Sequence, residues 1–233
     1  MAREALALVL GPPGDPRSNS VTLDIRSEIP PSRGLKSSSA VAVATLRAAH
    51  TALGRPSIDT SEIARQAAEI SLRSRVSVTG AFDDAAACAG GGLVVADVHR
   101  RWLLFASEPP CGLVPVLWIP SASHLPVEEL REKLKDAPPG AQDAVAEALR
   151  GHWAEAMRLN TRVIERALGY DLEPVKRRGL EAGARVCGVS GNGPALAFLC
   201  PPERVPEVVR SLESSEAQVV AVSFVPRSRG EAP

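Results

Sequence analysis

The stretch at residues 30–40 combines residue types that bind phosphate. It reads Pro-Pro-Ser-Arg-Gly-Leu-Lys-Ser-Ser-Ser-Ala. Gly34 permits a close backbone approach, and three serines open an apolar helical run. The first amides of a helix have no intrahelical partner and lie at the positive end of its dipole, so this helix start suits phosphate. Taken alone, such a Gly-x-x-Ser-Ser more often forms a turn with Ser37 as a helix cap, and the chain has no Gly-Lys-Ser/Thr of a Walker loop.

Two adjacent carboxylates, Asp83 and Asp84, open a short helical run within Thr-Gly-Ala-Phe-Asp-Asp-Ala. An Asp-Asp pair is most often a solvated helix start that the helix dipole stabilises. Here apolar and small residues flank the pair, which favours a position beneath a cleft. A carboxylate in such a position can accept the proton of a hydroxyl group during phosphoryl transfer.

A second glycine-rich segment, Gly-Val-Ser-Gly-Asn-Gly-Pro-Ala at residues 188–195, separates two apolar runs. Asn-Gly is a strong turn signal, so a simple tight turn is the plain interpretation. The alternative is a backbone loop that contacts phosphates, formed by Ser190, Gly191, Asn192 and Gly193.

Helices and strands alternate irregularly around these segments, which predicts an α+β fold over a doubly wound one. Apolar periodicity predicts that the first ten residues are the end of a helix that faces a core. Further helices are expected over 37–53, 60–73, 83–89, 125–134, 141–150, 153–168, 173–182 and 206–212. Strands are expected over 21–26, 93–96, 102–105, 114–119, 185–189, 195–199 and 219–225.

The three segments together resemble the motifs of the GHMP kinase superfamily, in the family order. Gly-Leu-Lys-Ser-Ser-Ser-Ala resembles its second motif, in which many members carry Gly or Ser in place of Lys36. Gly-Ala-Phe-Asp-Asp-Ala resembles the Gly-x-Asp-Asn-Ala segment of mevalonate-type members, which aligns Asp83 with the catalytic aspartate and Asp84 with the asparagine. Ser-Gly-Asn-Gly-Pro resembles the third motif. The first two segments have the form of archaeal-type shikimate kinases.

The resemblance implies that ATP and Mg²⁺ are bound and that Asp83 is the catalytic residue. Ser38 would hold the metal, with Ser37 as the near alternative, together with Glu69 on the helix before Asp83 or, failing that, Glu62. The implied ATP-binding residues are Pro30, Pro31, Ser32, Arg33, Gly34, Leu35, Lys36, Ser37, Ser38, Ser39, Ala40, Ser190, Gly191, Asn192 and Gly193.

The implied reaction is phosphorylation of a ring hydroxyl of shikimate by ATP, which gives 3-phosphoshikimate and ADP in aromatic amino-acid biosynthesis. Two alternatives stay open: a sister kinase that acts on homoserine, mevalonate or a sugar, and a nucleotide-binding relative without catalysis. The carboxylate of shikimate requires a cation, for which Arg33, Lys36 and Arg185 are candidates beside the motifs.

The family fold has two lobes, and we expect an N-terminal lobe like ribosomal protein S5 domain 2 over 1–112 and a ferredoxin-like lobe over 113–233. In the family, strands with a first motif precede the strand expected at 21–26. About twenty residues precede it here. We therefore expect a first lobe that is shortened at its start or that lacks its first strands.

The charge balance and the cysteine content limit which binding partners and which cellular compartment the sequence favours. Lys plus Arg and Asp plus Glu both number 27, so no basic excess favours nucleic acid. No apolar run is long enough to span a bilayer, and no secretory signal is visible. The four cysteines lie outside any CxxC pair, which favours a reducing cytoplasm. A monomer is the default expectation.

Overall fold

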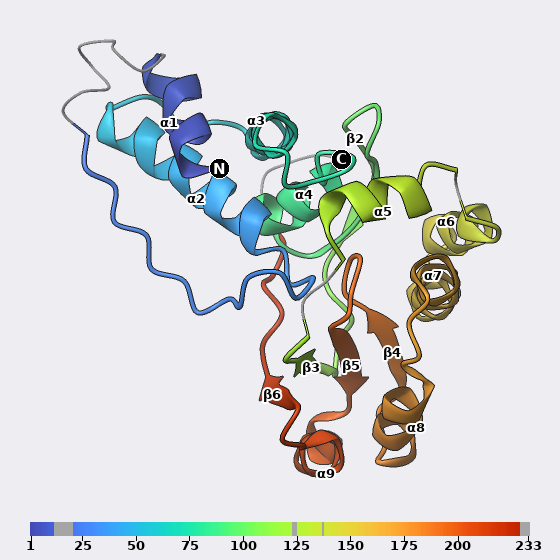
Figure 1. Cartoon of the computed structure of the whole chain (residues 1–233). Helices are drawn as coiled ribbons and strands as arrows, with labels where there is room; N and C mark the ends of the chain where they lie inside the picture. Colours follow the sequence, from blue (N-terminus) through green and yellow to red (C-terminus); the bar gives the residue numbers. More distant parts are fainter. Residues whose placement is uncertain (12–20, 123–124, 137, 229–233) are drawn as a thin grey trace. The chain divides into compact units, whose positions relative to one another are not determined.

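A computed structural model of the chain describes residues 1–11, 21–122, 125–136 and 138–228. The chain divides into two compact units, each with its own core (Figure 1). Of the described residues, 1–11, 21–30, 36–108 and 226–228 belong to the first unit, and 31–35, 109–122, 125–136 and 138–225 belong to the second. The architecture is α+β, as expected. The main chain leaves the first unit after Glu108, and residues 31–35 also belong to the second unit.

The described residues of the first unit form four helices and a β-hairpin, which Figure 1 labels. The helices are α1 (Ala2–Leu10), α2 (Ser37–Ala52), α3 (Thr60–Arg73) and α4 (Phe82–Gly90), and the antiparallel strands are β1 (Leu93–Asp97) and β2 (Trp102–Ser107). Small residues dominate the buried helix faces, which lets the helix backbones pack closely around Leu46, Ile63 and Phe82. This packing positions the starts of α2 and α4, where the predicted site residues lie.

The second unit is a four-stranded antiparallel sheet with helices, in the order β4-β5-β3-β6 (Figure 1). Its strands are β3 (Val114–Pro120), β4 (Val186–Val189), β5 (Leu196–Cys200) and β6 (Ala217–Ala221). Its helices are α5 (Val127–Lys133), α6 (Ala141–Leu149), α7 (Trp153–Leu168), α8 (Glu173–Glu181), the 3-10 turn η1 (Pro202–Arg204) and α9 (Val205–Leu212). Helices connect β3 to β4 and β5 to β6, and β4 and β5 are joined directly. This connectivity is ferredoxin-like, as expected.

The strand predicted over 21–26 is wrong, because residues 21–29 form neither helix nor strand. A strand needs a neighbour with which to share backbone hydrogen bonds. In the described part of the first unit, β1 and β2 pair with each other, and neither pairs with this segment. Val21 and Ile25, which the alternating pattern assigned to a buried face, are 44% and 46% exposed.

The last strand is also shorter at its end than predicted. A strand was expected over 219–225, whereas β6 covers Ala217–Ala221. The partner of β6 sets this limit, since Ala221 pairs with Val116 and β3 itself begins at Val114. Apolar residues beyond Ala221 therefore have little strand beside them to extend the ladder.

Candidate active site

Helix α2 begins at Ser37, as the sequence predicts, and Ser37 to Ser39 form its first turn. Lys36 precedes the helix in the left-handed region, with a φ of 63°. Within the described residues, no side chain caps this helix start and no acidic residue lies in its first turn. The amides without intrahelical partners and the helix dipole therefore suit an anion at Ser37–Ser39.

The glycine of the predicted phosphate loop packs against the second glycine-rich loop, inside the second unit. The Ser190 hydroxyl donates to the carbonyl of Gly34 at 2.9 Å, and the amide of Ala195 donates to the carbonyl of Arg33 at 3.3 Å. Gly34 has a φ of 81°, and a Cβ there would lie 2.4 Å from the Ser190 carbonyl oxygen and 2.7 Å from that of Gly193. Only glycine permits such a close contact between the two loops. The hydrogen bond from Ser190 to Gly34 joins them across 156 positions of sequence.

The chain's single tyrosine supports this second loop from outside the motif. The Tyr170 hydroxyl donates to the carbonyl of Asn192 at 2.9 Å, and burial raises the pKa of Tyr170. Sequence reasoning missed Tyr170, because it lies 22 residues before Asn192 and no motif or spacing marks it. Its hydroxyl holds the backbone whose Ser190 contacts Gly34.

The acid pair lies in the first turn of α4, where its two members have different surroundings. The Lys36 ammonium donates to Asp84 Oδ1, and the Lys36 and Asp84 side chains are 29% and 17% exposed. Burial raises the pKa of Asp84, whereas Lys36 acts to lower it. Asp83 is partly buried and, among the described residues, has no hydrogen-bond or ion-pair partner. The structure thus leaves Asp83 available and engages Asp84.

Glu69 lies on α3, with both carboxylate oxygens occupied. Arg73 Nε donates to Oε1 and an Arg101 guanidinium nitrogen donates to Oε2, each at 3.0 Å. The hydrogen bonds from Arg73 and then Arg101 lower the pKa of Glu69, so it is ionised at neutral pH. The fallback residue Glu62 lies about two turns before Glu69 on α3, and its carboxylate accepts a hydrogen bond from the Gln66 side chain at 3.0 Å. Within the described residues, no group of three or more His, Cys, Asp or Glu forms a ready-made metal site.

The three candidate cations for a substrate carboxylate have different environments. Lys36 is engaged by Asp84. Arg33 belongs to the segment that contacts Ala195 through its backbone. Arg185 is exposed, and its carbonyl accepts a long hydrogen bond of 3.4 Å from Arg158.

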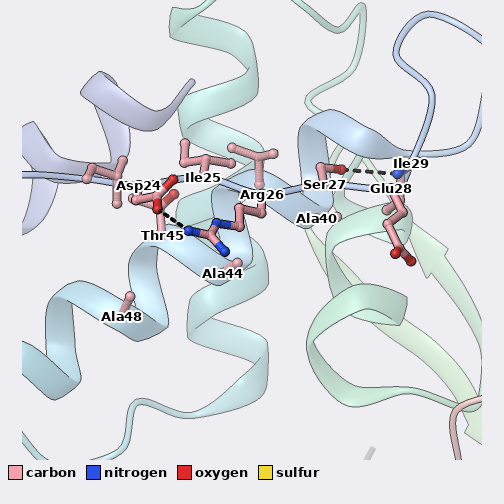
Figure 2. A pocket seen from close by; sticks show the side chains of 12 residues that line it. Asp24, Ile25, Arg26, Ser27, Glu28, Ile29, Ala40, Ala44, Thr45 and Ala48 are labelled. Carbon is pink, nitrogen blue, oxygen red and sulfur yellow. Dashed lines mark hydrogen bonds and ion pairs between the residues drawn. The ribbon is translucent and has the colours of Figure 1, made fainter.

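An open groove lies along α2 in the first unit (Figure 2). Its volume is about 730 Å³, and its two walls are the extended segment 23–29 and a face of α2 formed by Ala40, Val41, Ala44, Thr45 and Ala48. Figure 2 shows the Asp24–Arg26 ion pair on the extended wall. Of the predicted ATP-binding residues, Ala40 contributes to the wall of this groove.

Comparisons with known proteins agree with the motifs. Residues 2–92 match the model of the GHMP kinases N terminal domain. A shikimate kinase of Archaeoglobus fulgidus is 41% identical over 177 residues, which are 75% of this chain and 60% of that protein. A shikimate kinase of Pyrococcus furiosus is 39% identical over 193 residues, 82% of this chain and 68% of that protein. The chain thus spans about two thirds of the length of these relatives.

The fold has a counterpart among solved structures. A homoserine kinase from Cytophaga hutchinsonii superposes with a TM-score of 0.64 over 86% of this chain and 69% of its own, at 21% identity. At that identity the likeness concerns the fold.

Proposed function

Because the chain belongs to the GHMP kinase family, a family of small-molecule kinases, we propose that it transfers the γ-phosphoryl group of ATP to a ring hydroxyl of shikimate. The products are 3-phosphoshikimate and ADP. The observation that carries the proposal is the 39% identity to the Pyrococcus furiosus shikimate kinase over 82% of this chain. The locked loops at Gly34 and Ser190 and the available carboxylate of Asp83 support it.

The phosphates of ATP are bound by the residues 30–40 and 190–193 in this proposal. The amides of Ser37–Ser39 donate to phosphate oxygens at the start of α2, whose first turn itself contains no acidic residue. The loop of Ser190–Gly193, held by Tyr170, fixes the backbone of Gly34 in the conformation that a phosphate can approach closely.

Asp83 acts as the general base. It accepts the proton of the attacking hydroxyl while the oxygen of that hydroxyl forms the new bond to phosphorus and the bond to the ADP oxygen breaks. A base must be ionised before it accepts a proton, and it must be free of competing partners. Asp83 meets the second requirement among the described residues, and Asp84 does not.

The residue types at Ser38 and Glu69 fit a magnesium ion. Magnesium bound to a nucleotide usually takes one or two carboxylates and keeps phosphate and water ligands, so a complete protein cage is not required. Ser38 Oγ would hold it at the start of α2, and Glu69 would do so after giving up a hydrogen bond to Arg73 or Arg101. A bound magnesium ion neutralises charge on the phosphates.

The candidates for holding the shikimate carboxylate are Arg33, Lys36 and Arg185, of which Lys36 is paired with Asp84. We place the protein in the cytoplasm as a monomer. The four cysteines, which all lie among the described residues, carry free thiols, in keeping with a reducing compartment. None of the described helices has the length and apolar character to cross a membrane.

A coupled assay of ADP release tests the proposal. Purified protein with Mg²⁺ and ATP is supplied with shikimate, homoserine or mevalonate. We expect ADP release with shikimate alone. Release with homoserine or mevalonate instead would assign a sister activity, and ATP binding without ADP release from any acceptor would assign a non-catalytic nucleotide-binding role.

A further inference from the structure

The starts of α2 and α4 share an unusual backbone conformation. Each helix is preceded by a residue other than glycine in the left-handed region, Lys36 at a φ of 63° and Ala81 at 52°. Such residues persist in this region only where the surroundings hold them there. Both helix starts carry proposed site residues, Ser37 to Ser39 on α2 and Asp83 on α4. Their geometry therefore depends on contacts that fix these two turns.

The Lys36–Asp84 ion pair is a contact of that kind. It joins the residue before α2 to the first turn of α4, across 48 positions of sequence, inside the first unit. Both side chains are largely covered. A charge pair that is shielded from solvent is screened less than an exposed pair, and removal of one partner leaves the other charge uncompensated.

A cation on α2 itself, Arg47, contacts the opposite end of α4. An Arg47 guanidinium nitrogen donates to the carbonyl of Ala89 at 2.6 Å. Carbonyls in the last turn of a helix lack intrahelical partners, and a cation there also complements the helix dipole. Helix α4 is thus tied to α2 near both of its ends, by Lys36 at the start and by Arg47 at the finish.

We infer that Lys36 is a positioning residue that acts through Asp84 and sets the start of α4, and with it Asp83, relative to the phosphate-binding turn of α2. The inference rests on the proposed function for the reaction in which this alignment matters. It also assigns separate tasks to the acid pair. Asp84 anchors the turn, and Asp83 stays free to accept a proton. The alignment of acceptor and phosphate governs turnover more than nucleotide affinity. We therefore expect the loss of the Lys36–Asp84 pair to lower kcat.

A double-mutant cycle tests whether Lys36 acts through Asp84. We expect Lys36→Met to lower kcat about tenfold or more, with KM for ATP changed much less. Lys36→Arg should restore most of the loss, because it keeps the cation. In the Asp84→Asn background the effect of Lys36→Met should shrink to within about twofold. If Lys36→Met costs the same factor in both backgrounds, Lys36 acts on the nucleotide or substrate directly and the inference is overturned.

Arg47→Met is the matched control, since it cuts the other tie between the same two helices. It should lower the melting temperature without the loss of kcat. Equal losses of kcat in Arg47→Met and Lys36→Met would mean that general helix packing is responsible, and would also overturn the inference.

Hydrogen exchange by mass spectrometry separates this inference from the proposed function. Lys36→Met should speed amide exchange in the peptides that begin α2 and α4, and Arg47→Met should do so at the end of α4. Unchanged exchange at both helix starts in Lys36→Met overturns the positioning role even if shikimate is the substrate. Faster exchange there, with no turnover of shikimate by the wild-type protein, supports the tie and rejects the proposed function.

Discussion

The two neighbouring carboxylates of α4, Asp83 and Asp84, have different surroundings. We therefore expect their substitutions to lower turnover by different factors. Asp83→Asn should keep the fold and ATP binding but lower kcat by a factor on the order of 10² or more, the usual scale for a general base. Asp84→Asn should lose much less, because it removes an anchor and leaves the base. Steady-state kinetics with circular dichroism as a check on folding would measure both. A larger loss in Asp84→Asn would show that the alignment of Asp83 with the family aspartate is out of register.

The role proposed for Glu69 predicts that its substitution changes the dependence of activity on magnesium. Glu69→Gln keeps the shape of the side chain but removes its charge, so magnesium should bind the nucleotide complex about tenfold more weakly. The measurement is ADP release as a function of Mg²⁺ at saturating ATP. Glu62→Gln, on the same helix, is the control that should change little. An unchanged magnesium dependence in Glu69→Gln would transfer the role to Glu62 or another residue.

At the scale of elements, the contact between the two glycine-rich loops can be tested by adding one methyl group. In Gly34→Ala the new Cβ would meet the carbonyl oxygens of Ser190 and Gly193, so the loops must separate. We expect the dissociation constant for ATP to rise about tenfold or more, which corresponds to about 1.4 kcal/mol. Isothermal titration calorimetry would measure it.

Gly54→Ala is the matched control for this substitution. Gly54 also has a positive φ, of 61°, but a Cβ there would meet nothing within 4 Å. The two variants share the backbone strain and differ in the clash, so their difference in ATP affinity reports the loop contact. Equal effects of the two substitutions would mean that strain alone, and not the contact with Ser190, matters at Gly34.

At the scale of the whole molecule, the two units have separate cores. The reactivity of two cysteine thiols tests whether the core of the second unit is buried. Cys187 and Cys200 are buried in that core, and burial raises the pKa of each thiol to about 11. Because the thiolate is the reactive form, at pH 8 these cysteines should react with iodoacetamide on the order of a hundredfold more slowly than an ordinary thiol.

Peptide mass spectrometry after timed alkylation would check this expectation. Cys111 is exposed and serves as the fast internal control. Denaturant that unfolds the second unit should bring Cys187 and Cys200 to the rate of Cys111. Fast labelling of Cys187 in the native protein would contradict the buried core of the β4-β5-β3-β6 sheet.

The sequence by itself determined the local elements and the identity of the motifs. The start of α2 at Ser37 followed from a glycine loop, serines and an apolar run, and strands β1 and β2 and most elements of the second unit followed from apolar periodicity. These features depend on neighbours a few residues away, and that is the information that a pattern contains. The roles assigned to Asp83, Ser38 and Glu69 came from the family resemblance and stay predictions.

Tertiary structure alone decided which residues meet. The segment 21–26 has the alternation of a strand but lacks a described partner, and alternation cannot supply one. Lys36 finds Asp84 across 48 positions, and the two oxygens of Glu69 are taken partly by Arg101, which lies 32 positions away. Such pairings depend on how helices and a hairpin pack, because ion pairs and hydrogen bonds act over a few ångströms of space and not along the chain.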